Sequence, residues 1–563
     1  MAANNDNPRM SWGLGPIAYD GTRTPEKAVL FLVLCTAWLL PGLVGHDPWK
    51  SDEAIAFGIV HDMLRSHDWV AFTVAGEAMP DHAPLFLWVS AAFASLLGGV
   101  LALHDAARLA SGAFMAVTLA AVTLASRELL GERALRMGVL LLIGSTGLLI
   151  RAHEMSTDLA GLAGIAVALY GAALAHRRPV HGGAVLGLGA GMAFLGDGFM
   201  PLALVVALIV VLPLASRLWR TRAYATAAGI AILVALPLVA SWPLLLHFTH
   251  PDRLAPWLGS ATAFAAPDEP FAAGYFLRIL PWYAWPAWPL AAWALYRARH
   301  DLALRRPLLL PALAFVAFFA VLGVFGEARE VNALPLLLPL VLLGVAELES
   351  VPRGAASALD WFGMTTFFLF ALIVWLGWLA AMTGHPEAAR AWLQREVPGF
   401  AYRFNFFAVA LAALLTLIWL VVVARSLRST RRALVNWAAG ITMAWMLVMT
   451  LGVPLVDQAR SYRGVAAQLA AALPAGAGCV ARENVGDAQR ALLDYFAGLR
   501  TVPHDDARAA RCNVLLVQAA PKRLQPPGPQ WRETWRGSRP GDRNEAFALY
   551  RRAAARDSTT STQ

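Results

Sequence analysis

Long apolar runs separated by short polar segments dominate this chain. Spanning a bilayer takes about 20 apolar residues, because only a helix satisfies its own backbone amides away from water. Hydrophobic residues make up 58% of the 563 residues and charged residues 15%, against about 25% charged in ordinary globular chains. These values exclude a soluble multidomain or disordered protein. Fourteen candidate runs begin near residues 26, 84, 108, 137, 158, 181, 199, 224, 274, 307, 331, 360, 404 and 433.

Basic residues collect in alternate loops, and such clusters mark the cytoplasmic side. They lie at 127–136, 177–178, 217–222, 297–306 and 425–432, while the loops between them are acidic. If all fourteen runs crossed, the 127–136 cluster would lie outside and every later loop would have the wrong charge. We therefore expect the run 84–103 to stay on the outer side. This predicts a polytopic α-helical membrane protein of about 13 transmembrane helices, with its C-terminus outside.

Three regions follow from this topology. We expect residues 1–25 to form a cytoplasmic N-terminus, which carries no secretory cleavage signal. Residues 26–456 should form a transmembrane domain, and its outer loop 46–107 should contain juxtamembrane helices. Residues 457–563 should form a small extracytoplasmic α/β domain. Patterns predict strands at 479–481, 514–518 and 545–550 and a helix at 487–496. Cys479 and Cys512 lie in this domain. A periplasmic disulfide between them is one hypothesis, and two buried thiols are the alternative.

Charged side chains gather in two segments on the expected outer side. One segment contains Asp52-Glu53, Asp68 and Asp81-His82, and the other runs from Arg151 to Asp158. Charges at membrane depth are costly and usually line a functional site, so we expect both segments to flank one cavity. In the structural alternative, Ser51 simply caps an interfacial helix that begins with these acids.

The order of these residues resembles the GT-C fold glycosyltransferases, in particular the lipid A aminoarabinose transferase and protein O-mannosyltransferase family. The resemblance covers about residues 26–175. It implies an inverting pentosyl or hexosyl transferase that moves a sugar from a polyprenyl-phosphate carrier to an envelope acceptor, which is a lipid A-like lipid, a glycan or a protein. The reaction would occur on the periplasmic face of a bacterial inner membrane. The matching pattern is Asp52-Glu53, Asp68-Trp69, Gly76, Asp81-His82-Ala83-Pro84-Leu85, Ala107-Arg108-Leu109 and Asp158.

The resemblance also implies roles for single residues. Asp52, the first acid of its pair, would be the catalytic carboxylate, with Asp158 and Glu53 as further catalytic residues. The family places a lysine against the lipid phosphate where this chain has His82, and a neutral imidazole is a weaker anion partner. The candidates for binding the donor phosphate are therefore Asp81, His82, Arg151, Arg253, Arg278 and Arg329.

No cofactor is required by this chemistry, and a divalent metal stays open. Zinc favours histidine and carboxylate ligands, for which Asp81, His82 and His250 are candidates without a closed ligand set. We expect a monomer surrounded by membrane lipids that binds no nucleic acid. The Trp- and Pro-rich run at 281–289 predicts a kinked helix. Two other functions stay open, a lipid-linked sugar flippase and a GT-C scaffold without catalysis, although no repeat typical of transporters is visible.

Overall fold

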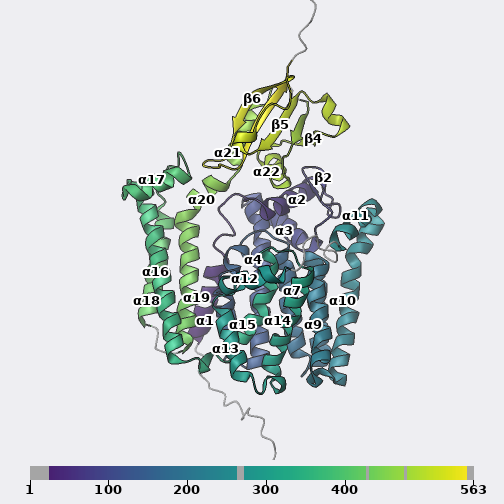
Figure 1. The fold of residues 1–563 in the computed structure, drawn as a ribbon, viewed down its shortest axis with the longest axis vertical. Helices are drawn as coiled ribbons and strands as arrows, with labels where there is room; N and C mark the ends of the chain where they lie inside the picture. The colour runs from purple at the N-terminus through teal and green to yellow at the C-terminus, as the bar shows by residue number, and fades with distance from the viewer. Residues whose placement is uncertain (1–24, 263–271, 426–429, 475–477, 554–563) are drawn as a thin grey trace, which may run out of the picture.

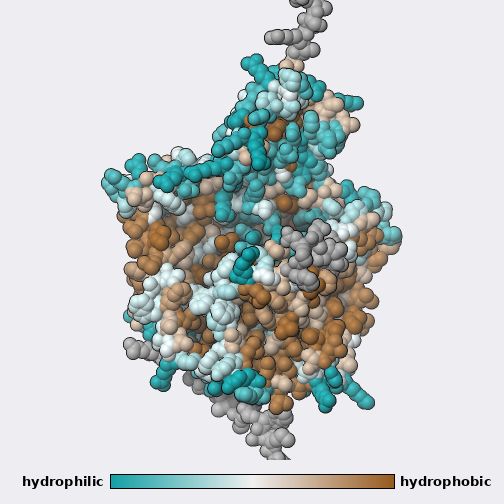
Figure 2. All heavy atoms as spheres, viewed as in Figure 1, coloured by the Kyte–Doolittle hydropathy of each residue, from teal (hydrophilic) through white to brown (hydrophobic). Residues whose placement is uncertain are grey.

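A bundle of α-helices forms most of the molecule, and a small β-sheet domain stands at one end of it (Figure 1). The computed structural model describes residues 25–262, 272–425, 430–474 and 478–553. Apart from Pro25, the N-terminal segment expected in the cytoplasm lies outside these residues. Hydrophobic residues cover the middle of the visible face of the bundle, and hydrophilic residues lie at both ends (Figure 2). This distribution matches a multi-pass membrane protein.

The first part of the chain forms one long helix and a group of short elements. α1 (Pro25–Leu39) leads to α2 (Asp52–Ser66), the hairpin β1 (Thr73–Val74) and β2 (Glu77–Ala78), and α3 (Pro84–Leu97). α2 begins at Asp52, where the sequence places acids in the first turn beside the positive end of the helix dipole. α2, β2 and α3 lie at the end of the bundle that carries the sheet domain (Figure 1).

The remaining helices build the bundle itself. They are α4 (Leu103–Leu130), α5 (Leu135–Ile143), α6 (Leu148–Arg151), α7 (Asp158–Leu174), α8 (Pro179–Asp197), α9 (Phe199–Ala215), α10 (Arg222–Thr249), α11 (Pro251–Thr262), α12 (Ala273–Tyr283), α13 (Ala287–Ala298), α14 (Arg306–Phe325), α15 (Leu334–Ala346), α16 (Arg353–Thr383), α17 (Glu387–Glu396), α18 (Phe406–Arg425), α19 (Thr430–Leu447) and α20 (Val453–Arg460). The kink predicted at 281–289 is confirmed, because α12 ends at Tyr283 and α13 begins at Ala287.

Seven helices among the described residues are long and apolar enough to cross a membrane, and several shorter apolar helices accompany them. The count of thirteen crossings therefore stays a prediction. α3 has 14 residues, which is a length of about 21 Å, whereas a membrane core is about 30 Å thick. Other helices counted as crossings, such as α12 and α15, are shorter still, so the expectation that α3, which packs beside α2, does not cross stays a prediction.

A five-stranded sheet forms the core of the C-terminal domain. Its strand order is β4-β3-β5-β7-β6, with β3 parallel to both neighbours and β7 antiparallel to both of its own. The predicted α/β character is confirmed, and Cys479 and Cys512 form a disulfide with Cα atoms 5.1 Å apart. The elements are α21 (Arg463–Ala472), β3 (Val480–Glu483), α22 (Asp487–Ala497), β4 (Thr501–Pro503), β5 (Val514–Ala519), β6 (Trp531–Gly537) and β7 (Ala546–Arg552).

Contacts between α2 and α22 fix the sheet domain over the bundle. A Cβ atom on Gly58 of α2 would lie 2.6 Å from the Cβ of Ala491 on α22, so only glycine allows the two helices to pack this closely. Arg500 forms ion pairs with both helices: its Nη2 is 2.8 Å from Oδ1 of Asp62 in α2, and its Nε is 3.3 Å from Oδ2 of Asp494 in α22. The helix that begins at Asp52 is thus held between the bundle and the sheet domain.

Candidate active site

Asp52 lies where three distant parts of the chain meet. Its Oδ2 atom is 3.2 Å from Nη2 of Arg329, in the connection between α14 and α15, and 3.9 Å from Nη1 of Arg151 in α6. The Asp52 side chain is 34% exposed, so a substrate can reach it. The predicted convergence of the two outer segments therefore occurs at Asp52 and Arg151, and Arg329 joins them from nearly 280 residues away in the sequence.

Glu53 is buried and bonded to groups other than Arg151 and Arg329, which favours a structural role over the catalytic role expected from the sequence. Its two carboxylate oxygens accept hydrogen bonds from Nε of Arg108 at 2.6 Å and from the backbone N–H of Trp49 at 2.9 Å. Both Glu53 and Arg108 are buried. Burial raises the pKa of the Glu53 carboxyl, and the charge of Arg108 lowers it. The resulting pKa lies below the usual value of a glutamate. Glu53 thus anchors the start of α2 and leaves the substrate side to Asp52.

Asp158 lies near Asp52 but faces its own small cavity. It is the first residue of α7 and accepts a hydrogen bond from Ser156, and the charges of Asp52 and Arg329 both act on it. A cavity of about 30 Å³ lies between Asp158 and Asp197, at the end of α8, and is closed by the apolar side chains of α9, α14 and α15. The structure therefore places Asp158 beside the site, together with a second acid.

Asp197 was not predicted as a site residue. The tight packing of α7 on α8 brings it to Asp158, since a Cβ atom on Gly164 would come within 2.3 Å of the backbone N of Ala193. Thr157 donates a hydrogen bond to Asp197 at 3.3 Å. An acid at the end of the glycine-rich apolar run 182–196 is the sequence signal that could have indicated it.

Tyr283 is a second residue that sequence reasoning missed. Its ring packs where a Cβ atom on Gly147 would be, and its backbone carbonyl accepts the Gly147 N–H at 2.9 Å. The hydroxyl is buried and finds no hydrogen-bond partner among the described residues. The charges of Arg151 and Asp158 act on this phenol. Its hydroxyl is therefore an unpaired polar group at the edge of the site.

The other phosphate-binding candidates lie apart from Asp52 as far as the described contacts show. His82 and Asp81 bond each other at 3.1 Å, and this bond lowers the pKa of Asp81. Arg253 pairs with its neighbour Asp252 at 3.3 Å, and Arg278 lies 5.8 Å from the ring of Tyr275. Of the six candidates, the described contacts bring only Arg151 and Arg329 to Asp52, the expected catalytic carboxylate.

The predicted metal ligands do not converge in the described contacts, since His250 pairs with Asp68 at 3.2 Å and not with Asp81 or His82. A different group, His61, Asp62 and Asp494, has its ligand atoms within 4.8 Å of one another.

Arginine side chains already form ion pairs with the carboxylates of this second group. Arg65 contacts Asp62 at 2.6 Å and Asp494 at 2.5 Å. These ion pairs fit a structural junction between α2 and α22.

Comparison with known proteins places these features in context. Residues 81–242 match the family model of dolichyl-phosphate-mannose-protein mannosyltransferase. The undecaprenyl phosphate-alpha-4-amino-4-deoxy-L-arabinose arabinosyl transferase of Pseudomonas paraeruginosa is 27% identical over 459 residues, which cover 77% of each chain. The protein of the same name from Pseudomonas aeruginosa (strain LESB58) is 27% identical over 455 residues, 76% of each chain.

The same similarity extends to three-dimensional structure. The crystal structure of ArnT from Cupriavidus metallidurans bound to undecaprenyl phosphate matches with a TM-score of 0.66 and 17% identity, over 93% of this chain and 98% of that chain. Its apo state matches with a TM-score of 0.65 over the same shares. The two proteins therefore share one fold over nearly their whole length, from the helical bundle to the C-terminal domain.

Proposed function

We propose that this chain, a GT-C fold membrane glycosyltransferase, transfers an amino-deoxy pentose from undecaprenyl phosphate to a lipid A-type acceptor. The resemblance seen in the sequence is confirmed by the comparisons. The matched proteins are named as transferases, so neither a flippase nor an inactive scaffold is favoured. The observation that carries the proposal is the meeting of Asp52 with Arg151 and Arg329 in a chain that aligns with such transferases over three quarters of its length.

The geometry suits an inverting displacement. An acceptor oxygen forms the new bond to the anomeric carbon, while the bond from that carbon to the carrier phosphate oxygen breaks and its electron pair leaves with the phosphate. Asp52 accepts the acceptor's proton or orients the attacking oxygen. Arg151 and Arg329 stabilise the charge that develops on the departing phosphate. Since guanidinium groups supply this charge, transfer should continue after dialysis against EDTA.

The cavity between Asp158 and Asp197 favours an amino sugar. Its volume of about 30 Å³ suits one water-sized group, such as an ammonium. An ammonium group pairs well with buried carboxylates, because burying their negative charge without a counter-charge costs free energy. The relatives' printed name contains a 4-amino-4-deoxy pentose. In this proposal the two acids hold the sugar's amino group while Asp52 faces the anomeric carbon.

The reaction is proposed for the periplasmic side of the bacterial inner membrane. The connections α9–α10 and α13–α14, which carry basic clusters, lie at the end of the bundle away from the sheet domain (Figure 1). Positive loops favour the cytoplasm, so the end with Asp52 would face outward. The Cys479–Cys512 disulfide fits an oxidising compartment.

Purified protein supplied with the radiolabelled undecaprenyl-phosphate sugar and lipid A tests the proposal. The wild type should form labelled lipid A, and Asp52→Asn should lower turnover by about 10²- to 10⁴-fold, as loss of a general base does. Asp252→Asn is the matched control, because Asp252 is 73% exposed on α11 and contacts only Arg253 in the ion pairs of the described residues. No labelled product from the wild type would refute the proposed function, and near-normal turnover of Asp52→Asn would refute the role of Asp52.

A further inference from the structure

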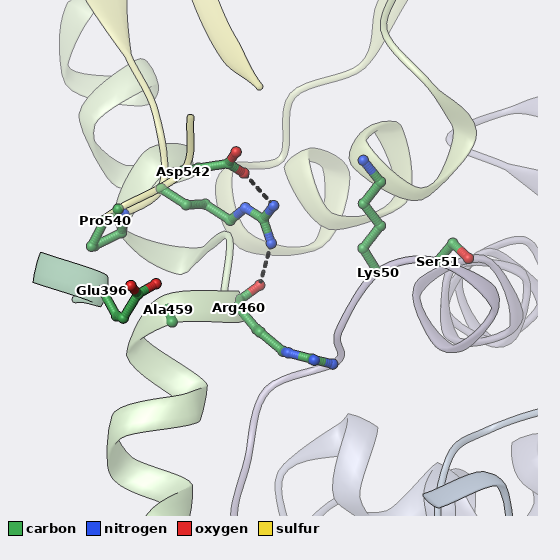
Figure 3. A pocket seen from close by; sticks show the side chains of 9 residues that line it. Lys50, Ser51, Glu396, Ala459, Arg460, Pro540 and Asp542 are labelled. Atoms are coloured by element: carbon green, nitrogen blue, oxygen red, sulfur yellow. Dashed lines mark hydrogen bonds and ion pairs between the residues drawn. The ribbon is translucent and has the colours of Figure 1, made fainter. Parts of the chain in front are cut away.

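A polar cleft lies between the sheet domain and the helical bundle (Figure 3). Its volume is about 500 Å³, and its walls come from the segment before α2, the ends of α17 and α20, and the connection between β6 and β7. A second hollow of about 430 Å³ shares Lys50, Arg539 and Asp542 with it, so the two are parts of one cleft. This volume is within the range of roughly 300–1,000 Å³ that small-molecule sites occupy.

Three cations line the cleft, and they differ in how far they are neutralised. Lys50 Nζ is 2.6 Å from a carboxylate oxygen of Glu545, and Arg539 pairs with Asp542 and also donates to the backbone carbonyl of Arg460 at 3.3 Å. The Nε atom of Arg539 is buried without a hydrogen-bond acceptor among the described residues.

Arg460 is the cation that stays available. It is exposed, and it forms no ion pair with any residue that the structure describes. Its guanidinium carbon lies 5.5 Å from the ring centre of Trp49, so an aromatic face orients the group. Figure 3 shows the Arg460 side chain extending toward the chain segment that leads to Lys50.

The cleft reaches the residue that precedes Asp52, the proposed catalytic carboxylate. Ser51 lines it and directly precedes Asp52, and consecutive Cα atoms are only about 3.8 Å apart. The charge of Arg460 also acts on Glu154, which bonds Arg151 in the site. Because Arg151 and Arg329 reach Asp52 from the bundle, the cleft offers a separate approach from the side of the sheet domain.

We propose that this cleft binds a phosphate group of the glycolipid acceptor, with Arg460 as its principal ligand and Arg539 and Lys50 in support. The inference rests on the proposed function. A guanidinium group matches a phosphate in shape and charge and can bind it in a bidentate manner. An acceptor held here would present its attacking oxygen to Asp52 from one side, while the donor phosphate lies against Arg151 and Arg329 on the other.

Steady-state kinetics of Arg460→Ala and Arg460→Lys test this inference. Arg460→Ala should raise the KM for lipid A about tenfold or more, since loss of a charged hydrogen bond weakens binding by about that factor, and should change the KM for the donor far less. Arg460→Lys should recover part of the acceptor affinity. Arg532→Ala is the matched control, because Arg532 is an exposed arginine of β6 that does not line the cleft.

A binding measurement without donor separates this inference from the proposed function. Detergent-solubilised wild type should bind bisphosphorylated lipid A more tightly than enzymatically dephosphorylated lipid A, and Arg460→Ala should abolish the difference. This comparison decides the inference even if the wild type transfers no sugar.

Three outcomes would overturn the inference. The first is a raised donor KM with an unchanged lipid A KM in Arg460→Ala, which would assign the cleft to the donor. The second is equal binding of both lipid A forms by the wild type. The third is competition by inorganic phosphate at concentrations as low as those of lipid A, which would show a simple anion site and no acceptor site.

Discussion

At the scale of single residues, Arg108 shows how a buried charge positions the site. Its guanidinium is fully buried and bonds Glu53 at 2.6 Å and Asp105 at 2.8 Å. It also donates to the carbonyl oxygens of Leu43 and His46. These bonds tie the segment between α1 and α2 to α4. The position of Asp52 therefore depends on its neighbour Glu53, which is itself buried against Arg108.

Glu53→Ala should unfold the site rather than slow the chemistry. Removing one partner of a buried ion pair costs about 3–5 kcal/mol, because the other charge stays buried, although Asp105 offsets part of this. We expect a clearly lower Tm in detergent, with Asp52→Asn as the comparison whose Tm stays normal. A Glu53→Ala protein with unchanged Tm and no turnover would return Glu53 to the catalytic residues.

Glu154 should make donor binding depend on pH, because it bonds Arg151, the proposed ligand of the donor phosphate. Burial raises the pKa of its carboxyl to about 7, although the Arg151 guanidinium, 3.0 Å away, acts in the opposite direction. Above pH 7 the ionised carboxylate would compete with the donor phosphate for Arg151, and below pH 7 the neutral acid would not. The donor KM should therefore rise as the pH increases from 6 to 8. Glu154→Gln should flatten this dependence, and an unchanged pH profile in that variant would contradict the competition.

The site could be predicted from the sequence only in part. Asp52 was singled out by its place in the pattern that resembles the family, whereas Arg151 was only one of six phosphate-binding candidates. Arg329 was one candidate among six, and only the fold selects it. Tyr283 and Asp197 were missed, because a tyrosine among tryptophans fits an interfacial belt and a single acid at a helix end is ordinary.

At the scale of elements, the short helix α3 determines on which side of the membrane every later loop is expected to lie. It ends at Leu97, and Val100 in the connection to α4 is 87% exposed. If α3 stays on the outer side, an impermeant thiol reagent should label Val100→Cys in intact spheroplasts. Arg217→Cys, between α9 and α10, should react only after permeabilisation. The reverse pattern would overturn the predicted topology.

Local sequence patterns predicted the elements that have a regular apolar pattern or that end at prolines. The amphipathic α2, the break between α12 and α13, and strands β3, β5 and β7 all follow from local patterns. The short hairpin strands β1 and β2 were not predicted, and neither were two strands of the C-terminal sheet. β4 has three residues and ends in Pro503, so it is too short for an alternating pattern. β6 is a mostly exposed edge strand rich in charged side chains, which makes its sequence resemble a loop.

At the scale of the whole molecule, the sheet domain forms part of the site's architecture. It packs on α2 through Ala491 and through the ion pairs of Arg500, and it supplies Arg539 to the cleft beside Ser51. Loosening this domain should therefore disturb acceptor binding more than donor binding, since Arg151 and Arg329, the proposed ligands of the donor phosphate, belong to the bundle.

The Cys479–Cys512 disulfide allows this dependence to be measured. It joins the residue before β3 to the residue two positions before β5 and closes a loop with a sequence separation of 33, which stabilises a domain by about 2–4 kcal/mol. The double variant Cys479→Ser/Cys512→Ser should make residues 478–553 more sensitive to protease added outside spheroplasts, and should raise the lipid A KM more than the donor KM. Cys35→Ser controls for the loss of a thiol, because Cys35 lies in α1. If the protease cuts the domain only after permeabilisation, the domain is cytoplasmic and the proposed orientation of the whole molecule is wrong.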